Sequence, residues 1–552
     1  MSKWRRTTIG PALAAALILL ALTGLSADQS AAQAPSQSPP SSQTPAPPAS
    51  QTAPATTKPS SLTLEDCVVQ AVRRNLGVAV QVYSYREADI ALTQAGEKFI
   101  PSLSFRATKQ DQNSASYSWM DASDVMTSKS LYGSASITQQ APLGGNFSVS
   151  INADKYDTNS RFSTINPRYD GTLSFSLTQP LLKNFGWQTS RREILVARNS
   201  KDIAENTLKS TLLDTVYSVE QAYWNYVYMI ESLKVQRQSL SRAEALLDKS
   251  RKEIAIGTLA PKEILSSQTE VSMIKADILQ AEMAVKDSAD TLRGLINAPL
   301  DRDLADFLPA DTPGFARREV NLEAELATAL KNRPDLQSSV LGIKSKEIDY
   351  SYAKNQILPQ LDLTAQYSSP GVSGDRILYQ DNNPLTGVIL GLVPGGASQA
   401  LRDALGFKYN NWTIQLQLSV PLSTMFTRAA VSLARAGLEQ QVAMMKQTEQ
   451  KAYLEVRSAV RAVETNFQRV GARREARELS EQKLEAEEAK LKVGLSNNFF
   501  VLNYQRDLSN QRTLELRAMI DYTLSLAYLD KVTGTSLDKR NIRVTDAADT
   551  AK

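Results

Sequence analysis

The residues of this chain that could do chemistry are few. Histidine is absent and Cys67 is the single cysteine, so the sequence lacks the commonest general base and any intramolecular disulfide. Carboxylates alone can carry acid–base chemistry, but the sequence contains no Walker loop, nucleophile elbow or metal-ligand cluster. We therefore expect no catalytic residue, no cofactor and no metal, and we predict that the protein is not an enzyme.

Two stretches look like sites but are better explained as structure. The aromatic run from Tyr223 to Tyr228 resembles a ligand cage, yet packing between helices explains it more simply. The charged run from Arg473 to Lys492 has the spacing of a solvated helix face with i,i+4 pairs. The formal net charge of +4, from 62 basic and 58 acidic residues, is too even to suggest a nucleic-acid partner.

The N-terminus has the pattern of an export signal. Basic residues between Lys3 and Arg6 precede an apolar run at 12–22 and a stretch of small residues, as in signal peptides. We assign 1–32 to a signal peptide. Residues 33–60 are rich in Pro, Ser, Thr and Gln, a composition that cannot bury a core, and we predict a disordered linker there.

The remaining sequence is duplicated. Segment 62–75 parallels 320–333, and the landmarks that follow recur in the same order. These landmarks are Pro101 with Pro359, Pro180 with Pro421, and Gly257 with Gly494. The period of about 240 to 258 residues is too long for a solenoid unit, so we infer two repeats, 61–318 and 319–537, followed by a flexible C-terminal tail at 538–552.

Both repeats predict the same order of elements. A helix of about 35 residues ends at a proline, because the residue before proline is pushed out of the α region. Strands, a long helix ended by a glycine, a tip and a shorter return helix follow. The expected bounds are helices at 63–99 and 322–357, strands within 101–180 and 359–421, long polar loops at 109–129 and 368–411, long helices at 189–256 and 427–493, tips at 257–261 and 494–498, and return helices at 261–296 and 498–532.

Helix lengths indicate how these elements are arranged. A helix of roughly 67 residues is about 100 Å long, and the opening and return helices are each about half of that. Two half-length helices placed end to end would flank the long helix. The segments 297–318 and 534 onward would then form a belt at its mid-height.

The strand segments are about ten residues long and alternate weakly apolar with polar residues, as outer-membrane barrel strands do. A soluble sandwich would show turn signals every 8–12 residues. Six or so strands cannot close a sizeable barrel alone, and an open edge is not tolerated in lipid. The strands therefore predict an oligomer.

With this order of elements the chain resembles the TolC-like outer-membrane efflux protein family. The resemblance rests on the duplicated helix–proline–strand entry, the strand exits "QPLL" and "VPLS", and the tips "IGTLAPKEIL" and "VGLSNNFFVLNYQRDLSNQ". It implies an α+β membrane protein whose trimeric outer-membrane β-barrel continues into a long periplasmic α-helical coiled-coil barrel. It also implies a periplasmic adaptor and an inner-membrane pump or ABC exporter as partners. The implied function is an exit duct for small molecules (drugs, toxic compounds) or secreted proteins in tripartite efflux or type I secretion.

The resemblance also points to site residues. The family gate uses carboxylates six and nine residues after the tip glycine of the second repeat, where this chain has Phe500 and Asn503. The same positions after Gly257 are Glu263 and Ser266, so an aspartate ring is not expected, and rings of Glu263, Asn503 or Phe500 are the alternatives. Phe499 and Phe500 are either an adaptor-binding patch or packing between helices. The helix–strand boundaries are expected at four prolines, listed here as Pro101, Pro180, Pro359 and Pro421.

The sequence leaves an alternative for the number of barrel strands and an alternative for the function. The first repeat holds an extra hairpin, so a trimer would have about 12 barrel strands without it or about 18 with it. A structural periplasmic coiled-coil protein without a pore is the alternative function.

Overall fold

A computed structural model describes residues 60–117, 124–160, 162–257, 262–298, 307–423 and 425–543. The predicted signal peptide and all but the last residue of the predicted linker lie outside these residues. The described residues form two compact units. The sheet unit comprises 99–187 and 359–420, and the helical unit comprises the described parts of 56–98, 188–358 and 421–552.

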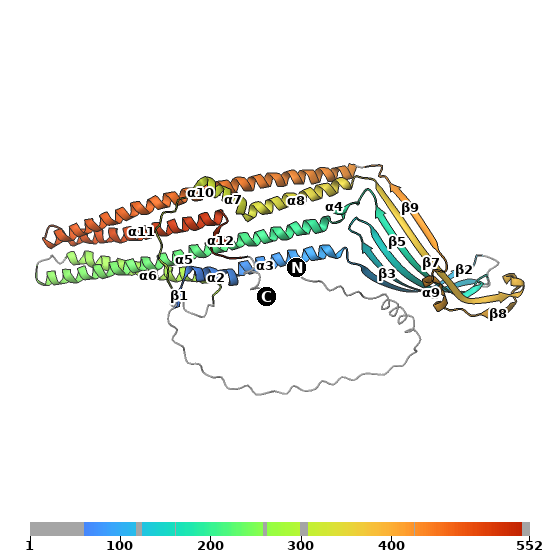
Figure 1. The fold of residues 1–552 in the computed structure, drawn as a ribbon. Coiled ribbons are helices and arrows are strands. Elements are labelled where there is room, and N and C mark those ends of the chain that lie inside the picture. Colours follow the sequence, from blue (N-terminus) through green and yellow to red (C-terminus); the bar gives the residue numbers. More distant parts are fainter. Residues whose placement is uncertain are drawn as a thin grey trace, which may run out of the picture. The chain divides into compact units, whose positions relative to one another are not determined.

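The sheet unit is built on antiparallel strands from both repeats (Figure 1). The order of hydrogen-bonded neighbours is β2, β3, β4, β5, β7. On its other edge, the first half of β7 pairs with β9 and the end of β7 pairs with β8. The strands are β2 (Ser102–Ala115), β3 (Val125–Gln140), β4 (Asn146–Thr158), β5 (Ile165–Pro180), β7 (Gln360–Tyr379), β8 (Ile389–Val393) and β9 (Asn411–Ser419). The extra hairpin of the first repeat, β3–β4, therefore lies inside the sheet, between β2 and β5.

The expectation of long polar loops is wrong in both repeats. Residues 109–115 and 125–129 continue β2 and β3, and residues 118–123 between them lie outside the described part. Segment 368–411 holds the second half of β7, two short 3-10 turns, β8 and the helix α9 (Ala397–Leu405).

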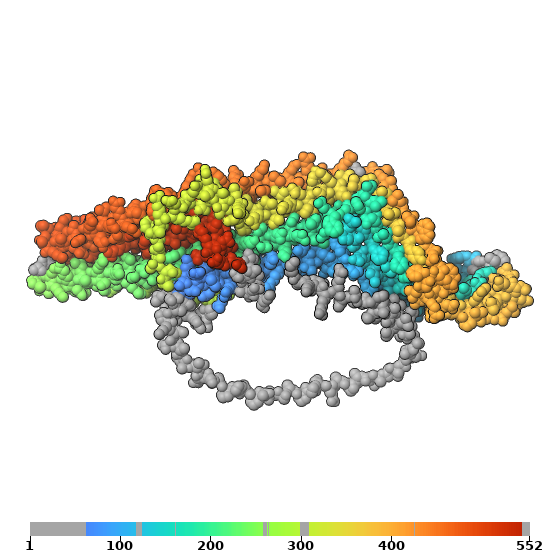
Figure 2. All heavy atoms as spheres, viewed as in Figure 1, coloured from blue at the N-terminus to red at the C-terminus, as the bar shows by residue number. Residues whose placement is uncertain are grey.

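The helical unit contains one long and one shorter helix from each repeat, and Figure 2 shows the two pairs packed along each other. The first repeat supplies α5 (Arg192–Ala255) and α6 (Glu263–Ile296), and the second supplies α10 (Met425–Lys492) and α11 (Asn498–Val532). In α10 Val456, Val463 and Val470 are buried in an apolar cluster shared with α11. Among the described residues, no helix combines the length and the apolar character needed to cross a bilayer.

The opening helix of each repeat is two helices rather than the single one predicted. The pairs are α2 (Leu64–Arg74) with α3 (Leu76–Glu97), and α7 (Leu322–Asn332) with α8 (Pro334–Asn355). Asn75 is extended, and its side chain accepts hydrogen bonds from the backbone N–H groups of Gly77 and Val78 as a cap for α3. In the second repeat Pro334 is the first residue of α8, which pushes Arg333 out of the α region.

A belt surrounds the middle of α5, as the helix lengths predict. Strand β1 (Ser60–Leu62) pairs with β6 (Phe307–Pro309), and the hydroxyl of Tyr223 on α5 donates to the Asp311 carboxylate at 2.9 Å. The end of the chain joins the same belt through α12 (Ser536–Lys539), and Arg540 is ion-paired with Glu220 of α5. Residues 539 and 540, within the segment predicted as a flexible tail, thus bind α11 and α5 through their charged groups.

Candidate functional site

The candidate site has two parts, the tips of the helical hairpins and the two faces of the sheet. Each tip begins at a glycine with positive φ, +84° at Gly257 and +76° at Gly494. The second tip is a Schellman turn, in which Leu495 N–H donates to Lys490 O and Gly494 N–H donates to Leu491 O. Asn497 then caps α11 by accepting from the backbone N–H of Phe500. The glycine is needed because other residues are strained at this φ.

The structure places the remaining residues of the predicted constriction on the two return helices. Glu263 is the first residue of α6, and its side chain lies outside the described part. Ser266 on α6 and Asn503 on α11 are half-buried, and Phe500 is 45% exposed. A ring made from these residues would need further copies of the chain, so their role in a constriction stays a prediction.

A different set of residues joins the two hairpins near the tips. The buried Asn498 side chain donates to the Ser250 hydroxyl at 2.8 Å. Further from the tips, Arg506 of α11 binds Glu270 of α6 through two N–H groups, one of them at 3.2 Å. The hydrogen bond to Glu270 raises the pKa of Arg506. Three helices are thus connected by polar contacts beside an apolar cluster that includes Leu246.

The sequence analysis missed the pair of Glu270 and Arg506. A signal was present, since Glu270 is 13 residues after Gly257 and Arg506 is 12 residues after Gly494. The two residues therefore occupy nearly equivalent positions of the duplicated hairpin, with opposite charges. Neither residue stands out in its own repeat, and the contact appears only when the hairpins are side by side.

The tips also expose apolar side chains. Ile256 is 76% exposed beside the first glycine, and Val493 and Leu495 are 69% and 79% exposed around the second. Phe499 and Phe500 meet edge to face with ring centroids 5.8 Å apart, and both remain about half exposed. The described chain therefore leaves about half of each ring uncovered, and both the adaptor-binding patch and the packing between helices stay predictions.

The second part of the site is the sheet, whose two faces differ in polarity toward its proline end. One row of cross-strand neighbours consists of apolar side chains, and the next row of polar ones. The apolar row is Leu103, Ile137, Val149, Phe175, Tyr367 and Trp412, and the polar row is Ser104, Ser136, Ser150, Ser174, Ser368 and Asn411. Because successive residues of a strand point to opposite sides, these rows lie on opposite faces. We call them the apolar face and the polar face.

The strand-boundary prolines lie where predicted along the chain. Pro101 directly precedes β2, Pro359 directly precedes β7, and Pro421 follows β9 within two residues. Pro180 closes β5, where Lys183 N–H donates to the Pro359 carbonyl at 3.3 Å. The exit of β5 and the entry of β7 are therefore adjacent at one end of the sheet.

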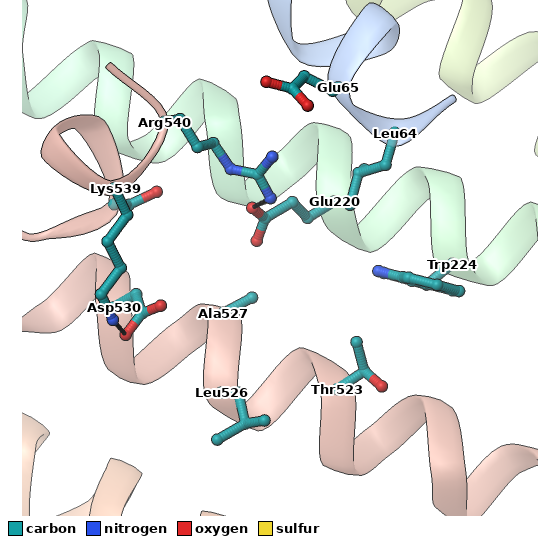
Figure 3. Close-up of a pocket in the computed structure, with 11 residues that line it drawn as sticks. Leu64, Glu65, Glu220, Trp224, Thr523, Leu526, Ala527, Asp530, Lys539 and Arg540 are labelled. Atoms are coloured by element: carbon teal, nitrogen blue, oxygen red, sulfur yellow. Dashed lines mark hydrogen bonds and ion pairs between the residues drawn. The ribbon is translucent and has the colours of Figure 1, made fainter. Parts of the chain in front are cut away.

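A hollow of about 380 Å³ lies at the belt of the helical unit (Figure 3). Arg540 extends from the end of the chain to the Glu220 carboxylate, while Lys539 binds Asp530 at 2.6 Å. Burial raises the pKa of Glu220, and Arg540 offsets this only in part. Four of the charged groups that line the hollow are thus paired with one another, Arg540 with Glu220 and Lys539 with Asp530. These two ion pairs hold residues 539 and 540 against α11 and α5. We assign the hollow no ligand.

The duplicated hairpins and the two-faced sheet define the chain as an α+β protein made from two copies of one helix–strand unit. Residues 68–298 and 326–535 match the model of the outer membrane efflux protein family, and the chain belongs to this family. The outer membrane protein OprJ of Pseudomonas aeruginosa is 22% identical over 312 residues, which are 55% of this chain and 57% of OprJ. Nodulation protein T of Rhizobium leguminosarum bv. trifolii is 20% identical over 66% of this chain and 72% of that protein.

Solved structures show the same fold. The Campylobacter jejuni CmeC outer membrane channel superimposes with a TM-score of 0.61 at 14% identity, covering 87% of this chain and 90% of CmeC. The VceC outer membrane protein of Vibrio cholerae gives a TM-score of 0.60 at 15% identity, covering 86% of this chain and 96% of VceC. At these identities the likeness concerns the fold alone, and the match to OprJ spans less than two thirds of that protein.

Proposed function

We propose that the protein is a passive outer-membrane exit duct that exports small molecules or secreted proteins together with energised inner-membrane partners. The observation that carries the proposal is the pair of adjacent rows in the sheet, one wholly apolar and one wholly polar. A sheet with this alternation suits a wall between lipid and a water-filled lumen. The proposal includes export by the signal peptide at 1–32 and the division into repeats at 318.

The edges of the sheet support assembly from several copies. Strands β2 and β9 are the outermost strands at the proline end, and every residue of both is exposed. They run antiparallel, so β9 of one copy can pair with β2 of the next and remove both open edges. Three copies would then contribute 18 strands, because the β3–β4 hairpin lies inside the sheet.

The stagger of the strands also supports closure. Ser102 is the first residue of β2. The row of cross-strand neighbours that contains Ser102 reaches β7 at Gln366, which is six residues beyond Gln360, the first residue of β7. Six residues span about 20 Å along the strands, and four strand spacings span about 19 Å across them. If the strands start at one level, they tilt by about 45°, within the range for membrane barrels.

The exposed tips support a protein partner at the ends of the helical hairpins. Uncovered Val493, Leu495 and Phe500 form an apolar surface at helix ends, as a docking site for a periplasmic adaptor requires. The Glu270–Arg506 contact would then hold the two hairpins together while the duct is at rest.

Single-channel conductance tests the proposal directly. Purified full-length protein should run as a heat-modifiable trimer in detergent and insert channels into planar bilayers of phosphatidylcholine. A protein that stays monomeric and dissolves without detergent, with no conductance, would instead support the structural coiled-coil alternative.

A further inference from the structure

The apolar face of the sheet ends at a row that carries two lysines. The last row of small side chains is Ala107, Gly133, Ala153, Gly171 and Gly371. The next row on the same face is Lys109, Leu131, Lys155, Tyr169 and Ser373. Lys109 and Lys155 therefore stand on either side of Leu131, about 10 Å apart across two strand spacings. The change from uncharged to cationic side chains occurs within a single row.

The lysines also lie at the height where a lipid headgroup is expected. From Phe147 at the base of the apolar face to Lys155 is eight residues of β4, or about 27 Å along the strand. At a tilt of about 45° this is about 19 Å along the membrane normal. The Lys155 stem extends by several ångströms more, so its ammonium group reaches the end of an apolar band of about 25 Å, and Lys109, about 10 Å away along the inclined row, stands about 7 Å nearer the base.

Neighbouring side chains on this face are those of a membrane interface. The Lys155 ammonium lies 5.8 Å from the centre of the Tyr169 ring. Further along the sheet Trp412 is 72% exposed, and Tyr409, directly after the α9 segment, is 50% exposed. Aromatic side chains with an apolar body and a polar tip favour the level of the headgroups.

The helix α9 covers the same face beside this row. Ala400 and Ala404 of α9 are buried, and a side chain at Gly371 would meet the Ala400 carbonyl at 2.1 Å. The helix thus lies directly on the backbone of β7 (Figure 1). Its Leu405 is 49% exposed and Arg402 is exposed, so an apolar and a cationic side chain remain for the membrane.

Acidic groups occupy the row beyond the lysines. Asp111 and Asp157 are the cross-strand neighbours of Lys129, and Lys129 lies 4.0 Å from Asp111. This third lysine is therefore already paired with a carboxylate. Lys109 and Lys155 form the row nearer the apolar face, where both can meet a headgroup phosphate.

From these features we infer that Lys109 and Lys155 bind the phosphate of an anionic lipid headgroup in the distal leaflet, with Leu131 and Tyr169 against the acyl chain and glycerol region. The inference rests on the proposed function, since it requires the apolar face to meet lipid. Charge complementarity selects the occupant, because two lysines beside an apolar surface match a phosphate that is carried on an acyl chain.

Lipid retention provides the test. Full-length protein in mixed micelles is given phosphatidylglycerol or phosphatidylcholine, and bound phospholipid is measured after gel filtration. The wild type should prefer phosphatidylglycerol, and Lys109→Gln with Lys155→Gln should reduce the preference by about fivefold for each lysine. The matched control is Arg106→Gln with Arg168→Gln, which removes one charge from the polar face of β2 and one from the polar face of β5.

Several outcomes would overturn the inference. One is a double lysine variant that keeps the wild-type preference within twofold, and another is a control variant that loses as much. Full displacement of the lipid by inorganic phosphate at equal concentration would show a site for free anions only. Conductance in pure phosphatidylcholine bilayers separates this result from the proposed function: channels without any lipid preference overturn only the headgroup site, whereas an absence of channels overturns the duct.

Discussion

Removing the two partners of the Glu270–Arg506 pair should have unequal effects on stability. The Glu270 side chain is 8% exposed and the Arg506 side chain is 54% exposed. Arg506→Met leaves a buried carboxylate without its cation, which costs about 3 kcal/mol. Glu270→Gln leaves a guanidinium that water can still solvate, so the loss should be about 1 kcal/mol. The double variant has no unpaired charge and should regain about 2 kcal/mol relative to Arg506→Met.

The assay is urea unfolding of the purified protein in detergent, followed by the helical circular dichroism signal. The four proteins of the cycle are compared by their unfolding free energies. If Glu270→Gln is as costly as Arg506→Met, or the double variant is no more stable than Arg506→Met, the burial-based reasoning is refuted. The resting conductance is a second measurement. An intact Glu270–Arg506 pair should lower the resting conductance because it holds the two hairpins together. Arg506→Met should then raise resting conductance in bilayers above that of the wild type.

Three other perturbations have defined outcomes. Gly494→Ala should destabilise the second tip by about 1 kcal/mol because φ there is +76°, whereas Gly437→Ala within α10 should be neutral or stabilising in the same unfolding assay. Burial raises the pKa of Glu220 above its usual 4.5, so this carboxyl group loses its proton at a lower pH in the unfolded chain than in the folded chain. The free energy of unfolding should therefore fall as pH rises from 4.5 through the folded pKa. Glu220→Gln should flatten this pH dependence in thermal melts, and an unchanged pH dependence would contradict the assignment. Gly371→Val should displace α9 and increase protease cleavage near 397–405, because its side chain would meet the Ala400 carbonyl at 2.1 Å; Gly133→Val, in the same row with its nearest atom at 3.9 Å, should leave cleavage unchanged.

Local signals in the sequence predicted the elements that local chemistry determines. Pro101 and Pro359 keep the residue before them out of the α region, and α3 and α8 end four residues before these prolines; Gly257 and Gly494 end helices because of their φ angles. Duplication strengthened both signals, since each was met twice. The break at Asn75 also has a local cause, a side-chain cap, but an asparagine within an otherwise helical pattern is a weak signal.

Contacts between distant segments could not be predicted in this way. Arg506 and Glu270 are 236 residues apart, and their pairing depends on how two hairpins pack. The same holds for α9, where two alanines fit against glycines of β5 and β7 that belong to different repeats. α9 has apolar residues at helical spacing, but at nine residues it is shorter than the window over which such a pattern identifies a helix.

The position of the β3–β4 hairpin means that strands can be gained or lost in pairs without disturbing the others. β2 and β5 already run antiparallel, so removing the hairpin would let them pair directly. Every other strand would keep its direction, its face and its connections. In the proposed trimer this single change would alter the barrel from 18 strands to 12, and its backbone diameter from about 39 Å to about 26 Å at a tilt of about 45°. Inserting or deleting one hairpin in a single repeat would therefore change the calibre of the proposed barrel.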